Sequence, residues 1–239
     1  MSQTVSNILN TLSKWAPIET QESWDNSGLQ CGDLNQKVNS ILISLDCDLN
    51  CLNAIKKHKP QLIITHHPIF FKPIKKIEWQ SDIGQILSTC IQNNCSLISM
   101  HTNLDIAPDG VNDAFIEKYN IDPKKTKTFQ TYGKYIKANK TKEELSTPIE
   151  AKIRGDESKT KFNKIAFCAG SGHGLVPYLS KYNIDAFITG EINYHDHVFC
   201  QFHHITVFEC DHKRSEQWIL KKIETYLQEK YSTISYNLV

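Results

Sequence analysis

The sequence has no hydrophobic run near the roughly 20 residues that a membrane-spanning helix needs, which argues against a membrane protein. It also shows no secretory signal, because no Lys or Arg precedes Lys14 and no apolar stretch follows the first Met. We therefore expect a cytoplasmic protein.

An excess of charge of one sign is missing too. Lys and Arg number 27 against 26 Asp and Glu, and the net charge of +1 makes nucleic acid an unlikely partner. The eight Cys include no C-x2-C pair, and a chain of 239 residues can bury a core without disulfides. The sequence thus predicts a globular protein whose cysteines are mostly buried thiols.

Short apolar runs alternate with helix-like segments in two stretches of the chain, beginning with an amphipathic helix over residues 5–15. Continuous apolar strands of this kind are typical of parallel sheets that helices cover on both faces. The expected strands are 41–45, 62–65, 97–100, 165–168, 186–189 and 206–209. We predict an α/β protein of two similar halves with mainly parallel sheets, 1–125 and 162–239, joined by a Lys- and Thr-rich connector, 126–161. Short strands near 129–138 and 149–153 could make this connector a source of edge strands.

Imidazoles and carboxylates follow several of these strands where each strand ends. In parallel α/β sheets, ligands bind beyond the carboxyl ends of the strands. Imidazole and carboxylate ligands suit Zn²⁺, Fe²⁺ or Mn²⁺, and a bridging carboxylate can hold two such ions. The sequence therefore predicts that the two halves pack around a dinuclear metal cleft. The predicted ligands are His66, His67, Asp105, His212 and Glu216.

Each of these groups also has an ordinary structural explanation. A His-His pair is common on surfaces or in cores, and Asp105 also fits the start of a turn. His212 and Glu216 are spaced i, i+4, as on any solvated helix face. Their shared position at predicted strand ends favours the metal site.

Further polar residues lie in the same strand-end segments. Glu191 and His195 are predicted to be the catalytic acid and base, although structural roles are equally open. His101 and Asn103 are predicted to bind the substrate, and Asp25 and Asn26 to brace the metal site.

The ordered motifs resemble the YbgI-like dinuclear-metal proteins, many of which are named type-two GTP cyclohydrolase I homologues. The motifs are Trp24-Asp25-Asn26-Ser27-Gly28-Leu29, Ile64-Thr65-His66-His67-Pro68, His101-Thr102-Asn103-Leu104-Asp105, Thr189-Gly190-Glu191 with His195, and His212-x-x-x-Glu216. The resemblance implies the same five ligands, two metal ions per chain and a hollow homo-hexamer. Longer members insert a domain in the middle, and the short connector here implies that this insertion is absent. This chain has Asp211 where the family usually has Gly before its last His.

The first functional hypothesis is a metal-dependent hydrolase, for which the resemblance implies ring opening of a purine nucleotide such as GTP. The alternative is a non-catalytic metal-binding hexamer that acts as an adaptor for protein partners.

Overall fold

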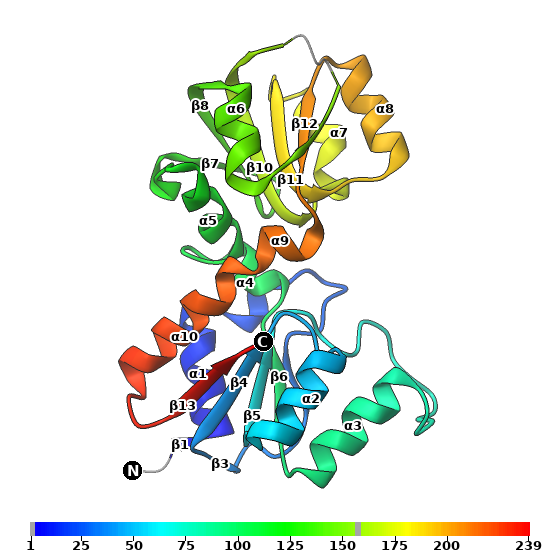
Figure 1. The fold of residues 1–239 in the computed structure, drawn as a ribbon, viewed down its shortest axis with the longest axis vertical. Coiled ribbons are helices and arrows are strands. Elements are labelled where there is room, and N and C mark those ends of the chain that lie inside the picture. Colours follow the sequence, from blue (N-terminus) through cyan, green and yellow to red (C-terminus); the bar gives the residue numbers. More distant parts are fainter. Residues whose placement is uncertain (1–2, 156–158) are drawn as a thin grey trace. The chain divides into compact units, whose positions relative to one another are not determined.

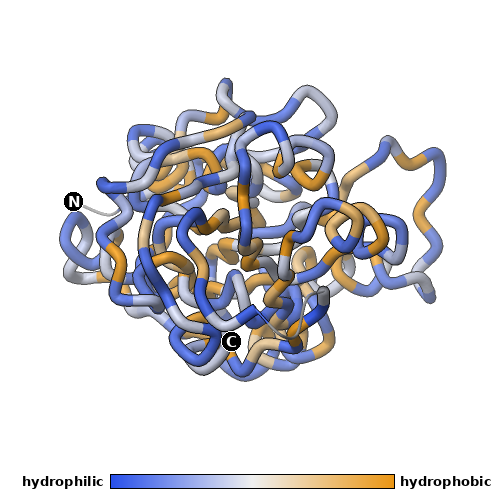
Figure 2. The backbone as a smooth tube through the Cα atoms, turned by 90° about the horizontal axis from the view of Figure 1, so that it is seen from above, coloured by the Kyte–Doolittle hydropathy of each residue, from blue (hydrophilic) through white to orange (hydrophobic). Residues whose placement is uncertain are grey.

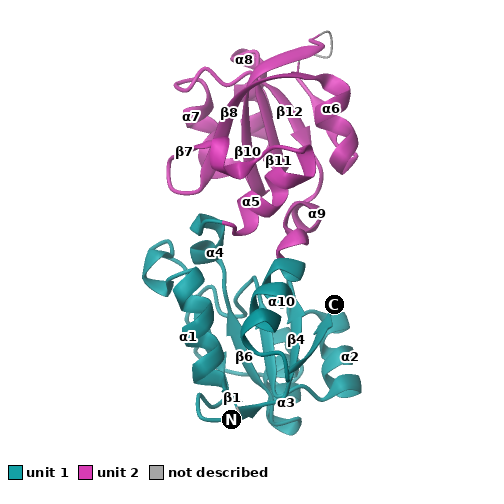
Figure 3. Ribbon diagram, turned by 90° about the vertical axis from the view of Figure 1, so that its left-hand side faces the viewer, with its two compact units in different colours: residues 1–108, 220–239 teal, residues 109–219 magenta. Residues whose placement is uncertain are grey.

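The computed structural model describes residues 3–155 and 159–239, which form two compact units (Figures 1 and 3). Unit 1 comprises Met1–Pro108 and Leu220–Val239, and unit 2 comprises Asp109–Ile219. Each unit combines helices with a sheet whose central strands are parallel, which confirms the predicted α/β class. No helix within the described ranges is both long enough and apolar enough to cross a membrane.

Unit 1 is built on a five-stranded sheet in the order β13-β4-β5-β6-β2, in which only β2 runs antiparallel to its neighbour. Its elements are β1 (Gln3–Thr4), α1 (Val5–Trp15), β2 (Gly28–Cys31), β3 (Lys37–Val38), β4 (Ser40–Ser44), α2 (Leu49–His58), β5 (Leu62–Thr65), α3 (Asp82–Gln92), β6 (Ser96–Ser99), α4 (Thr102–Ile106), most of α10 (Trp218–Lys230) and β13 (Ser235–Leu238).

Helices cover both faces of this sheet (Figure 1). Leu42, Ile63 and Leu97 point to one face, where they pack with apolar residues of α2 and α3. On α1 and α10, the rings of Trp15 and Tyr226 lie 4.9 Å apart, centroid to centroid. Because side chains alternate along a strand, the continuous apolar runs bury both faces.

Unit 2 has a six-stranded sheet in the order β7-β8-β10-β11-β12-β9, parallel at its centre and antiparallel at its edges. Its elements are α5 (Val111–Ile116), β7 (Lys127–Phe129), β8 (Gly133–Thr141), α6 (Lys142–Ser146), β9 (Lys152–Arg154), β10 (Lys161–Ser171), α7 (Val176–Leu179), β11 (Ala186–Glu191), α8 (Tyr194–Phe202), β12 (Thr206–Glu209) and α9 (His212–Glu216). Along the tube of Figure 2, hydrophobic stretches alternate with hydrophilic ones, as expected for buried strands between polar loops.

The path of the chain differs from the predicted halves in two ways. Residues 220–239 belong to unit 1, because β13 pairs with β4 and the hydroxyl of Tyr226 donates to the carbonyl of Thr11. The predicted connector, 126–161, contributes β7 and β9 as the two edge strands of the sheet of unit 2, and β8 beside β7, in line with the edge strands expected there. It is therefore part of that unit's sheet.

Candidate metal centre

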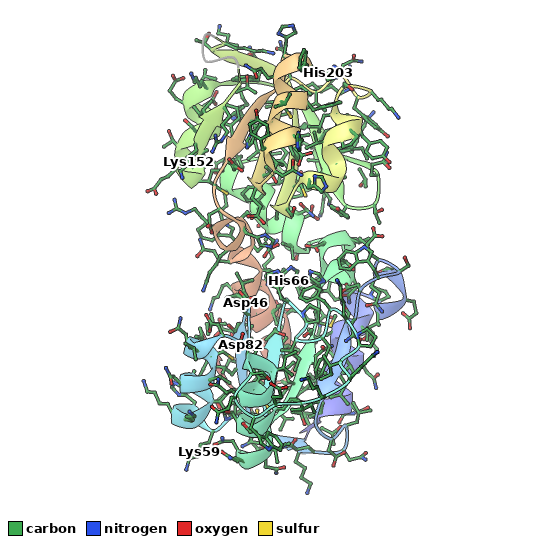
Figure 4. The ribbon with its side chains drawn as sticks, turned by 90° about the vertical axis from the view of Figure 1, so that its right-hand side faces the viewer. Asp46, Lys59, His66, Asp82, Lys152 and His203 are labelled. Carbon is green, nitrogen blue, oxygen red and sulfur yellow. The ribbon has the colours of Figure 1, made fainter. Side chains whose placement is uncertain are left out.

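The two histidines that follow β5 lie at the carboxyl end of the parallel strands of unit 1. His66 is fully buried, and its Nδ1 is 2.8 Å from the carbonyl oxygen of Met100. A carbonyl only accepts hydrogen bonds, so Nδ1 carries the proton and Nε2 presents the lone pair that a metal needs. This Nε2 is 3.8 Å from Oδ1 of Asp105. In Figure 4, His66 and Asp46 lie at one end of unit 1 and Lys59 at the opposite end.

Carboxylates orient the other two imidazoles of this group. Nδ1 of His67 is 2.9 Å from Oδ1 of Asp46, and Nδ1 of His101 is 2.8 Å from Oδ1 of Asp25. Burial acts to raise the pKa of Asp25, but hydrogen bonds from His101 and Thr102 outweigh it and hold that pKa well below its usual range. Asp25 is therefore an ionised, buried acceptor that fixes the His101 ring.

The rings of His66, His67 and His101 form one cluster. One potential ligand atom from each lies within 4.8 Å of the others. Three imidazoles converging at this spacing are a donor set suited to Zn²⁺, Fe²⁺ or Mn²⁺. We refer to these three residues with Asp105 as the unit 1 donor set.

His101 was predicted to bind the substrate, yet the structure brings its ring into the cluster that suits a metal. Asn103, the other residue predicted to contact the substrate, is fully buried. Its amide donates to the carbonyl of Ala16 and accepts from the hydroxyl of Ser27. The sequence held a signal for the position of His101, because this residue follows β6 as His66 follows the neighbouring β5.

Unit 2 carries a second group at the carboxyl end of its own parallel strands. His212 and Glu216 lie on α9, and Nε2 of His212 is 3.2 Å from Oε1 of Glu216. The other ring nitrogen, Nδ1, is 2.9 Å from Oε1 of Glu191, which ends β11. Glu191, predicted as a catalytic acid or base, thus orients the imidazole of His212. We refer to His212 and Glu216 as the unit 2 donor set.

Two glycines leave room for the unit 2 donor set. A Cβ on Gly170 would lie 2.1 Å from Oε1 of Glu216 and 3.2 Å from Nε2 of His212. A Cβ on Gly190 would lie 2.6 Å from Oγ of Ser215. The backbone is therefore shaped around a carboxylate and an imidazole, and this cradle and the donor chemistry of both sets fit divalent cations.

Asp211 precedes His212 in a backbone conformation that favours glycine, with φ 91° and ψ 139°. Its side chain accepts from the N–H of Arg214 and so caps α9. The helix cap offsets the strained backbone, and His212 still reaches Glu191 and Glu216.

His195 is exposed on the first turn of α8, where its ring contacts Tyr194. Sequence reasoning did not single out a nearby pair in which Nδ1 of the exposed His173 is 2.7 Å from Oδ2 of the buried Asp196. Both partners sit in loops or helix starts beyond the strands, so only the spatial arrangement identifies the pair.

Known proteins resemble this chain along most of its length. A Clostridium acetobutylicum protein named GTP cyclohydrolase 1 type 2 homolog is 33% identical over 211 residues, 82% of this chain and 78% of that one. A GTP cyclohydrolase 1 type 2 from Helicobacter pylori strain J99 is 33% identical, covering 89% and 87% of the two chains.

Solved structures share the fold. Reduced HcgD from Methanocaldococcus jannaschii has a TM-score of 0.88 at 24% identity, covering 100% of this chain and 98% of that one. The protein ybgI, described as of unknown function, has a TM-score of 0.85 at 15% identity and covers 99% and 98%.

The family model described as Duf34/NIF3 (NGG1p interacting factor 3) matches residues 3–239. This match and the relatives confirm the resemblance seen in the sequence motifs. The chain belongs to the DUF34/NIF3 family.

Proposed function

We propose that this protein is a dinuclear metal-dependent hydrolase that opens the ring of a purine nucleotide, as in a GTP cyclohydrolase. The ions in this proposal are two divalent cations, Zn²⁺, Fe²⁺ or Mn²⁺. Their proposed ligands are His66, His67, Asp105, His212 and Glu216. His101 joins His66 and His67 in a cluster that suits a metal, and we include it as a further candidate ligand.

The observation that carries this proposal is the way the imidazoles are held. His67 and His212 each have Nδ1 against a carboxylate, and His66 has Nδ1 against a carbonyl. This arrangement fixes the ring, leaves Nε2 as the coordinating atom and raises its basicity. The exposed His173 also has a carboxylate partner, but His66, His67 and His101 in addition converge, with one potential ligand atom of each within 4.8 Å of the others. The names of the relatives from Helicobacter pylori and Clostridium acetobutylicum support the hydrolase class.

Bound divalent cations would supply a water with a pKa near neutrality and polarise the bond under attack. The residues of this chain position those cations and move protons. Asp46 and Glu191 hold the rings of His67 and His212 in the coordinating orientation. His195 is exposed, and we propose that it transfers protons to and from the purine ring and the formamide that ring opening produces.

A cavity of about 450 Å³ in unit 2 adjoins Glu191 and Asp211 and supports a nucleotide substrate. Its basic residues are Lys152, Arg154 and Arg214. Arg154 and Arg214 form ion pairs with Glu209 and Glu150, which also line the cavity. Since carboxylates offset the basic groups, we propose that bound cations help this cavity to accept a polyphosphate.

The proposal is tested by metal content and turnover of protein purified without chelator. We expect two divalent ions per chain in the wild type and fewer in Asp105→Ala and Glu216→Ala. Asp82→Ala, which removes an exposed carboxylate of α3, is the matched control and should bind metal normally. Unchanged metal content in both site variants would contradict the metal centre. A metal-loaded wild type that is inert toward GTP and a panel of phosphoesters and amides would favour the adaptor.

A thiol nucleophile is the chemical rival to this mechanism, and Cys210 is its candidate. Cys210 lines the same cavity, but it is only 7% exposed, and burial raises the pKa of its thiol to about 12, so the thiol is not ionised at neutral pH. We expect Cys210→Ser to keep its turnover within about tenfold, whereas Glu216→Ala loses several orders of magnitude. Steady-state kinetics, with metal content measured in parallel, distinguish a thiol nucleophile from the metal mechanism. A serine variant that is inactive with its metal fully loaded would overturn the metal mechanism.

A further inference from the structure

Five of the eight cysteines gather on one side of the sheet of unit 1. Cys47, Cys51, Cys90 and Cys95 belong to one buried apolar cluster, and Cys31 packs against it. They come from separate parts of the chain: β2, the segment after β4, α2, α3 and the turn before β6. No disulfide joins any of them.

Within this group the thiols form contacting pairs. Cys31 and Cys90 are hydrogen-bonded through their thiols, as are Cys47 and Cys51. Cys31 ends β2, whose register places it opposite Leu97 of β6, and the backbone N–H of Leu97 also donates to its sulfur. Cys31 and Cys90 also line one cavity, so two interacting thiols from distant parts of the chain lie side by side and are a candidate pair for a disulfide.

The two members of the first pair differ in access. Both line a cavity of about 340 Å³, together with Cys95 and the side chains of Ile77 and Trp79. Cys31 is partly exposed, whereas Cys90 is only 1% exposed. An oxidant that enters the cavity therefore meets Cys31 first, and Cys90 lies behind it.

The electrostatics of the pair agree with this order. The hydrogen bond from Cys90, helped by the N–H of Leu97 and opposed by burial, lowers the pKa of Cys31. The same thiol contact and burial raise the pKa of Cys90. Because the thiolate is the reactive form, Cys31 is the nucleophile of the pair.

We propose that Cys31 and Cys90 are a peroxide-reactive pair that closes into a reversible intrachain disulfide. The sulfur of Cys31 attacks one oxygen of a hydroperoxide, breaks the O–O bond, becomes a sulfenic acid and releases water or an alcohol. The sulfur of Cys90 then displaces the sulfenic oxygen, which leaves as water with the thiol proton. In total the two thiols lose two electrons and two protons, and the hydroperoxide is reduced.

Cys47 and Cys51 do not compete for the oxidant in this proposal. Both are buried, and neither lines the cavity that gives access to Cys31. The thiol contact with Cys51 and burial also raise the pKa of Cys47. These two residues therefore remain reduced when Cys31 reacts.

The test treats the full-length, fully reduced and metal-free protein with one equivalent of hydrogen peroxide. Remaining thiols are then alkylated in denaturant, and the protein is digested and analysed by mass spectrometry. We expect a peptide pair linked through Cys31 and Cys90 that dithiothreitol separates. Cys90→Ser should instead hold Cys31 as a sulfenic acid that dimedone traps. Cys200→Ser, which removes a buried thiol of unit 2, is the matched control and should form the same disulfide as the wild type.

A disulfide between Cys47 and Cys51, or peroxide consumption with Cys31 and Cys90 still reduced, would overturn the proposal. A second measurement on the wild type needs no variant to fold. In native protein, iodoacetamide should label Cys31 at least roughly tenfold faster than Cys90, because the reactive thiol is the accessible one of low pKa. Equal or reversed rates would also overturn it.

Discussion

At the residue scale, the carboxylates that orient the imidazoles are as important to the proposed metal site as the imidazoles themselves. Asp46 comes from the loop after β4, and its Oδ1 is 2.9 Å from Nδ1 of His67. Glu191 plays the same part toward His212 from the end of β11. Each carboxylate contacts Nδ1, so Nε2 is the ring nitrogen proposed to coordinate.

Removal of Asp46 therefore tests the orientation of the imidazole without touching a proposed ligand. We expect Asp46→Ala to weaken the binding of Zn²⁺ by about 10- to 100-fold while the fold is kept, because the His67 ring loses its partner. Calorimetric titration of metal-free protein measures this change. Asp82→Ala is again the control, since Asp82 is an exposed carboxylate of the same unit. Equal affinities in the two variants would show that Asp46 does not orient the site.

Asp211 gives a second residue-scale prediction, about stability. Its side chain caps α9, but its φ of 91° is strained for a residue with a Cβ. Asp211→Ala loses the cap and keeps the strain, so we expect unfolding free energy to fall by about 1 kcal/mol. Asp211→Gly loses the cap but relieves the strain, and we expect it to be near the wild type. Urea denaturation followed by circular dichroism distinguishes the two, and a glycine variant less stable than the alanine one would contradict this account.

The sequence suggested the proposed ligands, whereas it mostly did not suggest the carboxylates that contact their rings. His66 directly follows β5, and His212 begins α9 just after β12. Their position at strand ends therefore identified both as candidate ligands. Asp46 lies in a loop whose path depends on how β4 and β5 pair. The local sequence pattern therefore does not predict its contact with His67. Glu191 was marked by its position, but its contact with His212 appears only in three dimensions.

At the scale of elements, α9 and the turn after β10 depend on each other. Gly170 in that turn has φ +64° and faces Glu216 of α9. Its backbone N–H also donates to the hydroxyl of Ser215 on the same helix. The close approach positions the unit 2 donor set, and it requires a residue without a Cβ.

Substitution of Gly170 tests this approach. We expect Gly170→Ala to displace the Glu216 carboxylate and to lower the metal content. The left-handed φ should add about 1 kcal/mol of destabilisation. Gly174→Ala is the matched control, because a Cβ there meets only the hydroxyl of Tyr132, at 3.3 Å. Metal analysis and urea denaturation of both variants check the prediction, and normal metal content in Gly170→Ala would count against it.

Strand and helix types were predictable because the apolar runs are continuous, but the destination of the last segment was not. Residues 220–239 follow unit 2 in sequence, yet β13 adds to the sheet of unit 1 beside β4. Pairing of strands nearly 200 residues apart is determined by tertiary structure, and hydrophobic periodicity does not predict it. Short strands could be predicted within the connector, but their pairing with β10 and β12 is again a matter of tertiary structure.

At the scale of the whole molecule, the exposed aromatic residues bear on assembly. Trp79, Tyr194 and Phe202 are 65%, 75% and 79% exposed in the single chain. Large apolar side chains of this kind are enriched where proteins bind one another. We propose that they contribute to the interfaces of the homo-hexamer that the family resemblance implies.

The corresponding prediction is that the protein in solution is a hexamer rather than a monomer. Light scattering after size-exclusion chromatography should give six times the chain mass of 27.4 kDa at micromolar concentration. If these aromatic residues lie in the interfaces, Trp79→Ser or Phe202→Ser should reduce the mass, because each interface loses apolar area that stabilises it. Lys59→Ser, at the end of unit 1 opposite His66, is the control and should keep the wild-type mass (Figure 4). A monomeric wild type would contradict the predicted hexamer. A hexamer that both aromatic substitutions leave intact would mean that other surfaces hold it together.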